Sequence, residues 1–165
     1  MMRRDVLGTA RRHPALTFGM AGGGFALLYI LSEPVLDALG GQEFTAPSAF
    51  LLLFVVGGFL GGALVAWLLW ERLGGERSPI RGAGIGALVG LLAMPVVFYF
   101  LELALVVVDG NPFEPLPGAT PGIQLGSDLL MFLLAPLLLG ALGVIVTYGG
   151  TVIVGALVGF LLARE

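Results

Sequence analysis

The chain contains no cysteine and no lysine, and it has a single histidine, His13. Without cysteine there can be no disulfide, no iron–sulfur cluster, no thiolate zinc site and no cysteine nucleophile. One histidine also rules out a bis-histidine haem or a multi-histidine metal cage within the chain. We therefore expect neither a metal nor a cofactor.

Charge is also scarce. Only 12% of the 165 residues are charged, whereas a soluble domain has about 25%. Apolar residues make up 58% of the chain, and 27 glycines add to them. Such a chain cannot cover a water-exposed surface with polar groups, and it is too hydrophobic to be disordered. These numbers exclude both a water-soluble monomer and a disordered protein.

The hydrophobic residues lie in long runs. A hydrocarbon core about 30 Å thick requires roughly 20 apolar residues of helix. Four stretches reach that length: residues 15–32, 48–70, 82–108 and 129–163. The sequence therefore predicts an all-α integral membrane protein, with residues 1–165 forming one transmembrane domain.

The last stretch is too long for one simple crossing. Its 35 residues would make a helix about 52 Å long at 1.5 Å per residue, beyond what the usual tilt accommodates. A turn at Gly140–Gly143 would leave residues 129–139 as a short re-entrant segment. A turn at Tyr148–Gly150 would instead give five crossings, and an unbroken helix would project from the bilayer. The predicted fold is a four-span helical bundle with a broken or re-entrant last segment, with five spans as the alternative.

The arginines indicate the topology. With four crossings, every arginine falls on one side of the membrane and only acidic residues fall on the other. The positive-inside rule then places both termini and the 71–81 loop in the cytoplasm of a multi-pass cell-membrane protein. Seven arginines are expected to orient the chain and contact lipid headgroups: Arg3, Arg4, Arg11, Arg12, Arg72, Arg77 and Arg81.

Pairs of glycines four residues apart recur in the apolar stretches. In a bilayer, small residues at this spacing allow two helices to approach closely, either within one chain or between copies. The candidate packing residues are Gly19, Gly23, Gly57, Gly61, Gly82, Gly86, Gly90, Gly155 and Gly159.

Glu102 is the only ionisable residue well inside a predicted span. Intramembrane carboxylates are costly and mark ion or proton sites by default. The simpler interpretation is that Glu102 reaches the nearby interface or pairs with Tyr99, one turn earlier. Glu102 shares a helix face with Pro95 and Phe98, opposite Gly82, Gly86 and Gly90, so this helix should contact protein on both sides.

Two outer segments look irregular or short. Ser32 is a typical helix-capping residue, Glu33-Pro34 follow it, and Gly40 is a typical residue after a helix end. This pattern predicts a separate short capped helix between Ser32 and Gly40. Residues 109–127 contain four prolines and four glycines and predict an irregular loop.

No catalytic constellation is present, so we expect no enzyme. The favoured function is a structural or accessory subunit that packs with itself or with a larger membrane complex. The alternative is a small oligomeric transporter or channel that uses Glu102 as a proton or cation site. The expected partners are membrane lipids and a second copy or a membrane complex, but no nucleic acid.

Overall fold

The computed structural model describes residues 8–110, 113 and 116–164, and that part of the chain contains helices but no strand. Four helices are long and apolar enough to span a membrane, which confirms the all-helical class and indicates a membrane-embedded protein. The elements are α2 (Pro14–Leu39), α3 (Ala49–Leu69), the 3-10 turn η1 (Gly75–Arg77), α4 (Pro79–Asp109), α5 (Pro121–Val146) and α6 (Gly150–Ala163).

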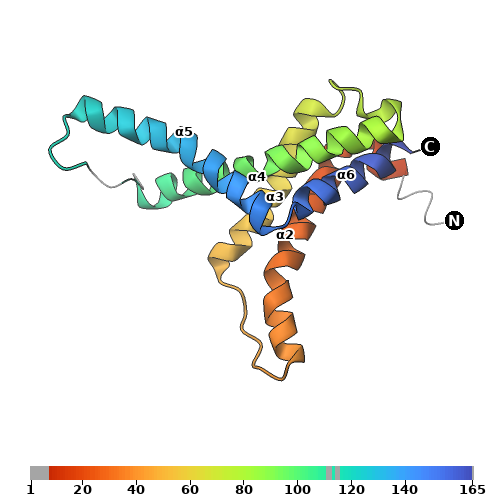
Figure 1. Ribbon diagram of the computed structural model, residues 1–165, viewed down its shortest axis with the longest axis horizontal. Helices are drawn as coiled ribbons and strands as arrows, with labels where there is room; N and C mark the ends of the chain where they lie inside the picture. The colour runs from red at the N-terminus through yellow and green to blue at the C-terminus, as the bar shows by residue number, and fades with distance from the viewer. Residues whose placement is uncertain (1–7, 111–112, 114–115, 165) are drawn as a thin grey trace.

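The helices form two arms that diverge from a common base (Figure 1). One arm, the α2–α3 arm, consists of the second half of α2 and the segment that leads back from it to the start of α3, and the other, the α4–α5 arm, pairs the second half of α4 with α5. Within the described residues, no Cα atom of α5 lies within 8 Å of α2 or α3. The base contains the beginning of α2, the end of α3, the beginning of α4 and α6.

The buried core lies in the base. Trp70, at the end of α3, is 1% exposed and packs against Phe18 of α2, with ring centroids 5.3 Å apart. The rest of the buried cluster comes from α3, α4 and α6: Val65, Ala66, Ile85, Val89, Leu162 and Ala163. Four helices thus share one core here.

Serine and proline set several helix starts. The Ser48 and Ser78 hydroxyls accept hydrogen bonds from the backbone N–H groups of Leu51 and Arg81, three residues on. Such bonds satisfy N–H groups that the first turn leaves without partners. Proline stands in the first turn of α4 and α5, where its missing N–H costs nothing.

The last apolar stretch is broken at Thr147–Gly149. Tyr148 and Gly149 both have a positive φ, 50° and 71°. The N–H of Gly149 donates to the carbonyl of Val144 at 2.8 Å and closes the end of α5. The expected turn at Gly140–Gly143 is wrong, because those residues are helical and α5 continues through them. Glycine is tolerated in a helix that packs on a neighbouring helix. Helix α5 ends where Tyr148 and Gly149 adopt the left-handed conformation.

The chain does not reverse direction at this break. Gly140 of α5 lies against Pro95 in the middle of α4. Beyond the break, Thr151 and Gly159 of α6 lie against Gly90 and Gly82. As the chain proceeds from Gly140 through Thr151 to Gly159, its contacts on α4 therefore move back from Pro95 through Gly90 to Gly82. The two helices run antiparallel to α4 one after the other.

Two of the segments that connect the apolar stretches are more helical than expected. Ser32 does not begin a new helix, because α2 runs unbroken to Leu39 and includes Pro34. The Ser32 hydroxyl donates to the carbonyl of Tyr29 at 2.6 Å, a bond back into the preceding turn. In the second segment, α5 already begins at Pro121, after Thr120 in extended conformation, so the irregular part of residues 109–127 is shorter than expected.

Candidate functional site

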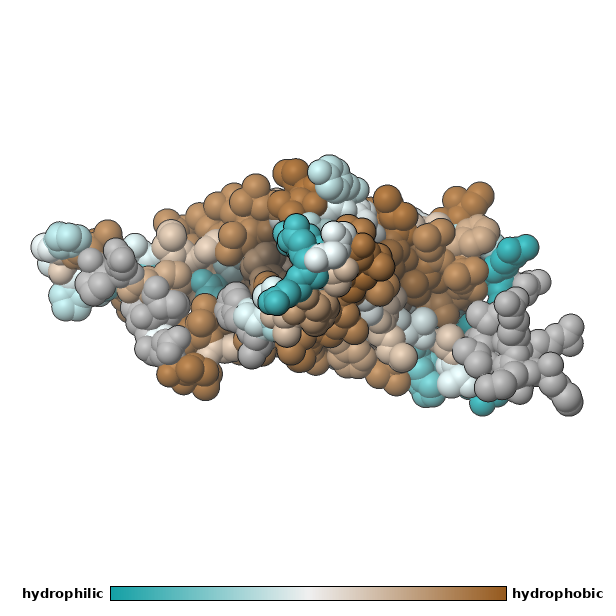
Figure 2. All heavy atoms as spheres, turned by 90° about the horizontal axis from the view of Figure 1, so that it is seen from below, coloured by the Kyte–Doolittle hydropathy of each residue, from teal (hydrophilic) through white to brown (hydrophobic). Residues whose placement is uncertain are grey.

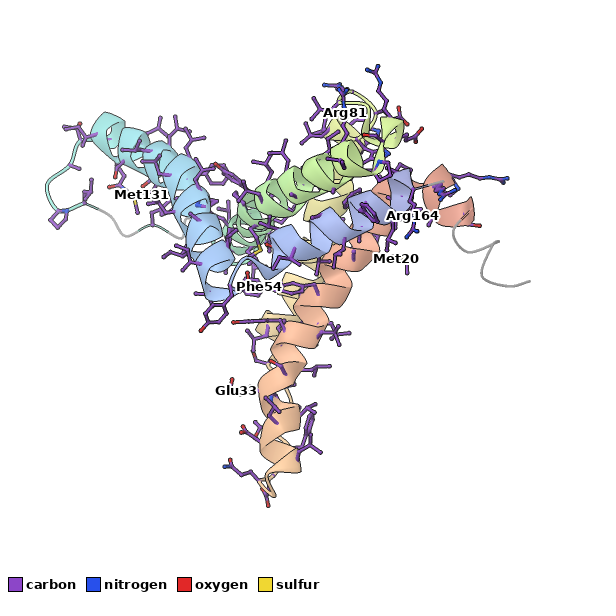
Figure 3. All side chains as sticks on the ribbon, turned by 45° about the vertical axis from the view of Figure 1, so that its right-hand side comes forward. Met20, Glu33, Phe54, Arg81, Met131 and Arg164 are labelled. Atoms are coloured by element: carbon purple, nitrogen blue, oxygen red, sulfur yellow. The ribbon has the colours of Figure 1, made fainter. Side chains whose placement is uncertain are left out.

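A cavity of about 380 Å³ lies where the two arms meet the base. Residues of α2, α3, α4, α5 and α6 all line it, as does Thr147 at the break. Most of the large side chains are apolar, among them Phe18, Phe25, Phe54, Met94, Phe98 and Leu142. Its volume is within the range of about 300–1,000 Å³ that is typical of small-molecule sites. Figure 3 shows Phe54 at this junction.

Small residues form much of the cavity wall. Ala21, Gly22 and Ala26 come from α2, Gly58 comes from α3 and Ala93 comes from α4. A cavity with such walls is wide because its lining side chains are short. Small residues at membrane depth also allow another helix or chain to come close to the backbone.

Three polar side chains reach the cavity. The Tyr29 hydroxyl donates to the carbonyl of Val146 across the junction, at 3.4 Å. The Thr147 hydroxyl lies 2.9 Å from the carbonyl of Gly143 and donates to it. The hydroxyl oxygen of Thr151 is buried and has no hydrogen-bond partner among the described residues. Buried polar groups normally have a partner, so Thr151 could hydrogen-bond to a molecule in the cavity.

The candidate glycines lie at the helix contacts of the base. A Cβ atom on Gly82 or Gly86 would clash with the carbonyl of Gly159 or Gly155, and one on Gly90 with that of Thr151. The α2–α3 and α3–α4 contacts are also close. A Cβ on Gly19 would lie 2.9 Å from the Phe59 oxygen, one on Gly23 3.1 Å from the Val55 oxygen, one on Gly57 2.8 Å from Val97 Cγ1 and one on Gly61 2.9 Å from the Ala93 oxygen.

Helix α4 therefore has protein on several sides. Its glycine face meets α6, Val97 meets α3, and Pro95 meets Gly140 of α5. The expectation that this helix contacts protein on both faces is met within one chain. α4 is the central helix of the molecule.

Glu102 and Tyr99 lie on α4 in the arm with α5. The Tyr99 hydroxyl donates to the carbonyl of Leu133 at 2.7 Å, and its ring packs on Phe132, with centroids 6.0 Å apart. The Tyr99 hydrogen is therefore directed to α5 rather than to Glu102. One carboxylate oxygen of Glu102, Oε2, is buried with no hydrogen-bond partner among the described residues.

The described arginines gather at the base. Arg72, Arg77 and Arg81 are exposed in and beside the turn between α3 and α4, and Arg81 Nε donates to the carbonyl of Leu73 at 2.8 Å. Arg11 and Arg12 line a second pocket together with Arg164. Figure 3 shows Arg81 and Arg164 at this end, whereas Glu33 lies on the α2–α3 arm. Arg3 and Arg4 lie outside the described residues.

The surface hydropathy follows the same plan. Figure 2 looks onto the tip of the α2–α3 arm and shows a mostly hydrophobic body. Hydrophilic residues gather at that tip, at the far end of the α4–α5 arm and at the base. This distribution suits a protein whose middle lies in lipid and whose three ends reach water or headgroups.

Sequence reasoning missed the cavity and the side chains that give it polarity. Thr147 and Thr151 flank the sequence Tyr148-Gly149-Gly150. Two hydroxyl residues beside a break in an apolar stretch were an available signal, because irregular backbone at membrane depth lies buried in protein or along a cavity. The convergence of five helices on this point depends on tertiary structure and had no sequence signal.

The four long apolar helices indicate a membrane-embedded helical protein. Comparisons of the chain with protein-family models, with curated proteins and with solved structures find no match.

Proposed function

We propose that this protein is a structural or accessory subunit of a cell-membrane assembly, and not an enzyme. The observation that carries the proposal is the pair of arms that diverge from a tightly packed base and leave an apolar cavity between them. The partner in this proposal is a transmembrane helix, from a second copy or from a larger complex, that packs between the arms. Small residues such as Gly22 and Ala26 on the cavity wall support close helix approach.

The proposed topology has four crossings with the base in the cytoplasm. Arginines from both ends of the chain and from the α3–α4 turn gather at the base, which is what the positive-inside rule expects of a cytoplasmic face. α5 and α6 together would form the fourth crossing, because both run antiparallel to α4. At 31 residues, α4 is about 46 Å long and must tilt to fit a hydrocarbon core of about 30 Å. Tilting of both arms in opposite directions accounts for their divergence.

Photo-crosslinking in native membranes tests the partner. The chain has no cysteine, so a single cysteine can carry a benzophenone reagent. Leu142→Cys places it on the cavity wall, and Leu138→Cys, one turn earlier on α5 and similarly exposed, places it outside the cavity lining. We expect a protein adduct of fixed mass from Leu142→Cys only. An adduct at twice the chain mass identifies a second copy. Adducts with lipid alone from both positions would contradict the proposal.

The second candidate function is proton or cation transport by an oligomer, with Glu102 as the site. It is favoured by the buried Oε2 of Glu102, which has no hydrogen-bond partner among the described residues. A carboxylate in that position binds a proton or a cation more readily than one that is already paired.

Flux measurements in proteoliposomes decide this alternative. If Glu102 carries protons or cations, the wild-type protein gives flux above empty liposomes and Glu102→Gln returns it to background. Glu33→Gln is the matched control, because Glu33 is exposed on α2 and lies outside the cavity lining. Wild-type flux equal to that of empty liposomes would end the transport proposal and leave the accessory one.

A further inference from the structure

A second, smaller pocket lies at the base, between residues that precede α2 and residues at the end of α6. Its volume is about 280 Å³, and its lining includes Arg11 and Arg12, which precede α2, and Arg164, which follows α6. Trp70 and Leu162 form its apolar floor, and Glu76 of η1 is the only acidic residue among the described residues that line it. Three arginines and one glutamate among the described residues therefore line the same pocket.

The composition of this pocket matches a phosphate group. Guanidinium groups present a planar set of N–H donors that fits phosphate oxygens in pairs, and two or three such groups around one anion are typical of phosphate recognition. The excess of positive over negative groups favours an anion. Glu76 can accept a hydrogen bond from a hydroxyl or ammonium group attached to that anion.

The position of the pocket matches a lipid. Trp70 ends the apolar run of α3, and the exposed charges of Glu71 and Arg72 follow it directly, so the pocket lies where the apolar helices end. Basic pockets between transmembrane helices at the cytoplasmic boundary bind anionic lipid headgroups. Trp70 and Leu162 are almost fully buried and form the floor of the pocket, so the bound lipid contacts the pocket through its headgroup.

We propose that this pocket binds the phosphate of one anionic phospholipid from the cytoplasmic leaflet. The bound lipid joins the N-terminal segment to the end of α6 and so closes the base. This site is separate from the cavity between the arms, and it does not depend on which partner, if any, occupies that cavity.

Native mass spectrometry of protein extracted from phosphatidylcholine membranes with 20% phosphatidylglycerol tests the site. We expect the wild-type protein to retain one phosphatidylglycerol. The variant Arg12→Gln/Arg164→Gln should bind phosphatidylglycerol about 30-fold more weakly. Each arginine near an anionic lipid strengthens binding by roughly fivefold, and the variant lacks two. The matched control Arg72→Gln/Arg77→Gln loses the same charge at the same end but outside the pocket, and it should retain the lipid. Equal loss from both variants would overturn the proposal, because it would indicate general surface attraction.

Two further measurements make the result specific. Glu76→Gln removes the opposing carboxylate and should increase phosphatidylglycerol retention, an outcome that a damaged fold cannot produce. Addition of 10 mM inorganic phosphate should leave the lipid bound. Displacement of the lipid by phosphate, or no increase with Glu76→Gln, would contradict a lipid headgroup site.

Discussion

Gly86 of α4 and Gly155 of α6 lie backbone to backbone in the base: a Cβ atom on either residue would clash with the carbonyl oxygen of the other. The same reciprocal contact joins Gly82 and Gly159, one turn away. In lipid there is little hydrophobic force between helices, so this close approach supplies the packing that holds α6 on α4.

The first prediction concerns this contact. Gly86→Ala should lower the free energy of unfolding by about 1–3 kcal/mol, because the added methyl group forces two backbones apart. Gly84→Ala is the control on the same helix, since a Cβ there meets nothing within 4 Å, and it should raise stability by up to about 1 kcal/mol because alanine is the better helix former. Unfolding in mixed detergent–SDS micelles, followed by circular dichroism, measures both. Equal effects would show that α6 does not lie on this face of α4.

The second prediction concerns the break between α5 and α6. Gly149→Ala should destabilise the protein by about 1–2 kcal/mol, because a left-handed conformation brings the added Cβ close to the following carbonyl. Tyr148→Gly should stabilise it, since Tyr148 has a positive φ and is 93% exposed. Gly126→Ala, inside α5 and facing open space, is the control. Thermal denaturation in detergent gives the order, and a stabilising Gly149→Ala would mean that the helix runs through this point.

The third prediction concerns the hydrogen bond between the helices of the α4–α5 arm. Tyr99→Phe removes the donor to the Leu133 carbonyl and should cost about 0.5–1.5 kcal/mol of stability. Tyr148→Phe removes the same hydroxyl from an exposed ring and should have no measurable effect. The same unfolding assay compares them. A neutral Tyr99→Phe would indicate that α5 does not pack on α4 at this level.

The fourth prediction separates stability from function at Glu102. Glu102→Met should raise the free energy of unfolding by about 1–3 kcal/mol, because it removes a buried carboxylate oxygen that has no partner among the described residues. Glu33→Met, on an exposed position of α2, should give no such gain. A loss of stability in Glu102→Met would show that the carboxylate is bonded in the folded protein.

The class of fold could be predicted from the sequence because hydrophobic length alone determines it. The four long apolar helices follow from runs such as 48–70 and 82–108, which need no tertiary information. The arginine distribution and the four-residue glycine spacing are also local patterns. Which glycines face each other, such as Gly86 and Gly155, depends on how distant helices meet, and sequence patterns do not specify that.

The errors have local physical causes. Glycine is a poor helix former, so the sequence favours a turn at Gly140–Gly143. In the structure Gly140 is helical and allows α5 to pack on Pro95. Ser32 resembled a helix start, but its hydroxyl bonds back to Tyr29 and α2 continues. Glycine occurs both in turns and at close helix contacts, and serine occurs both at helix starts and within helices. In both cases the sequence pattern predicted the first role and the structure has the second. The cavity, and Thr151, whose hydroxyl has no partner among the described residues, result from the meeting of α2, α3, α4, α5 and α6.

In the proposed topology α5 and α6 form one broken crossing, and residues 11–12, the α3–α4 turn and Arg164 lie on the same side of the membrane. Single cysteines at Gln42, Arg77, Ala119 and Arg164, labelled in intact cells by a membrane-impermeant thiol reagent, measure this directly. We predict that Gln42→Cys and Ala119→Cys react in intact cells, and that Arg77→Cys and Arg164→Cys react only after the membrane is permeabilised. Reaction of Arg164→Cys in intact cells would contradict the account and require five crossings.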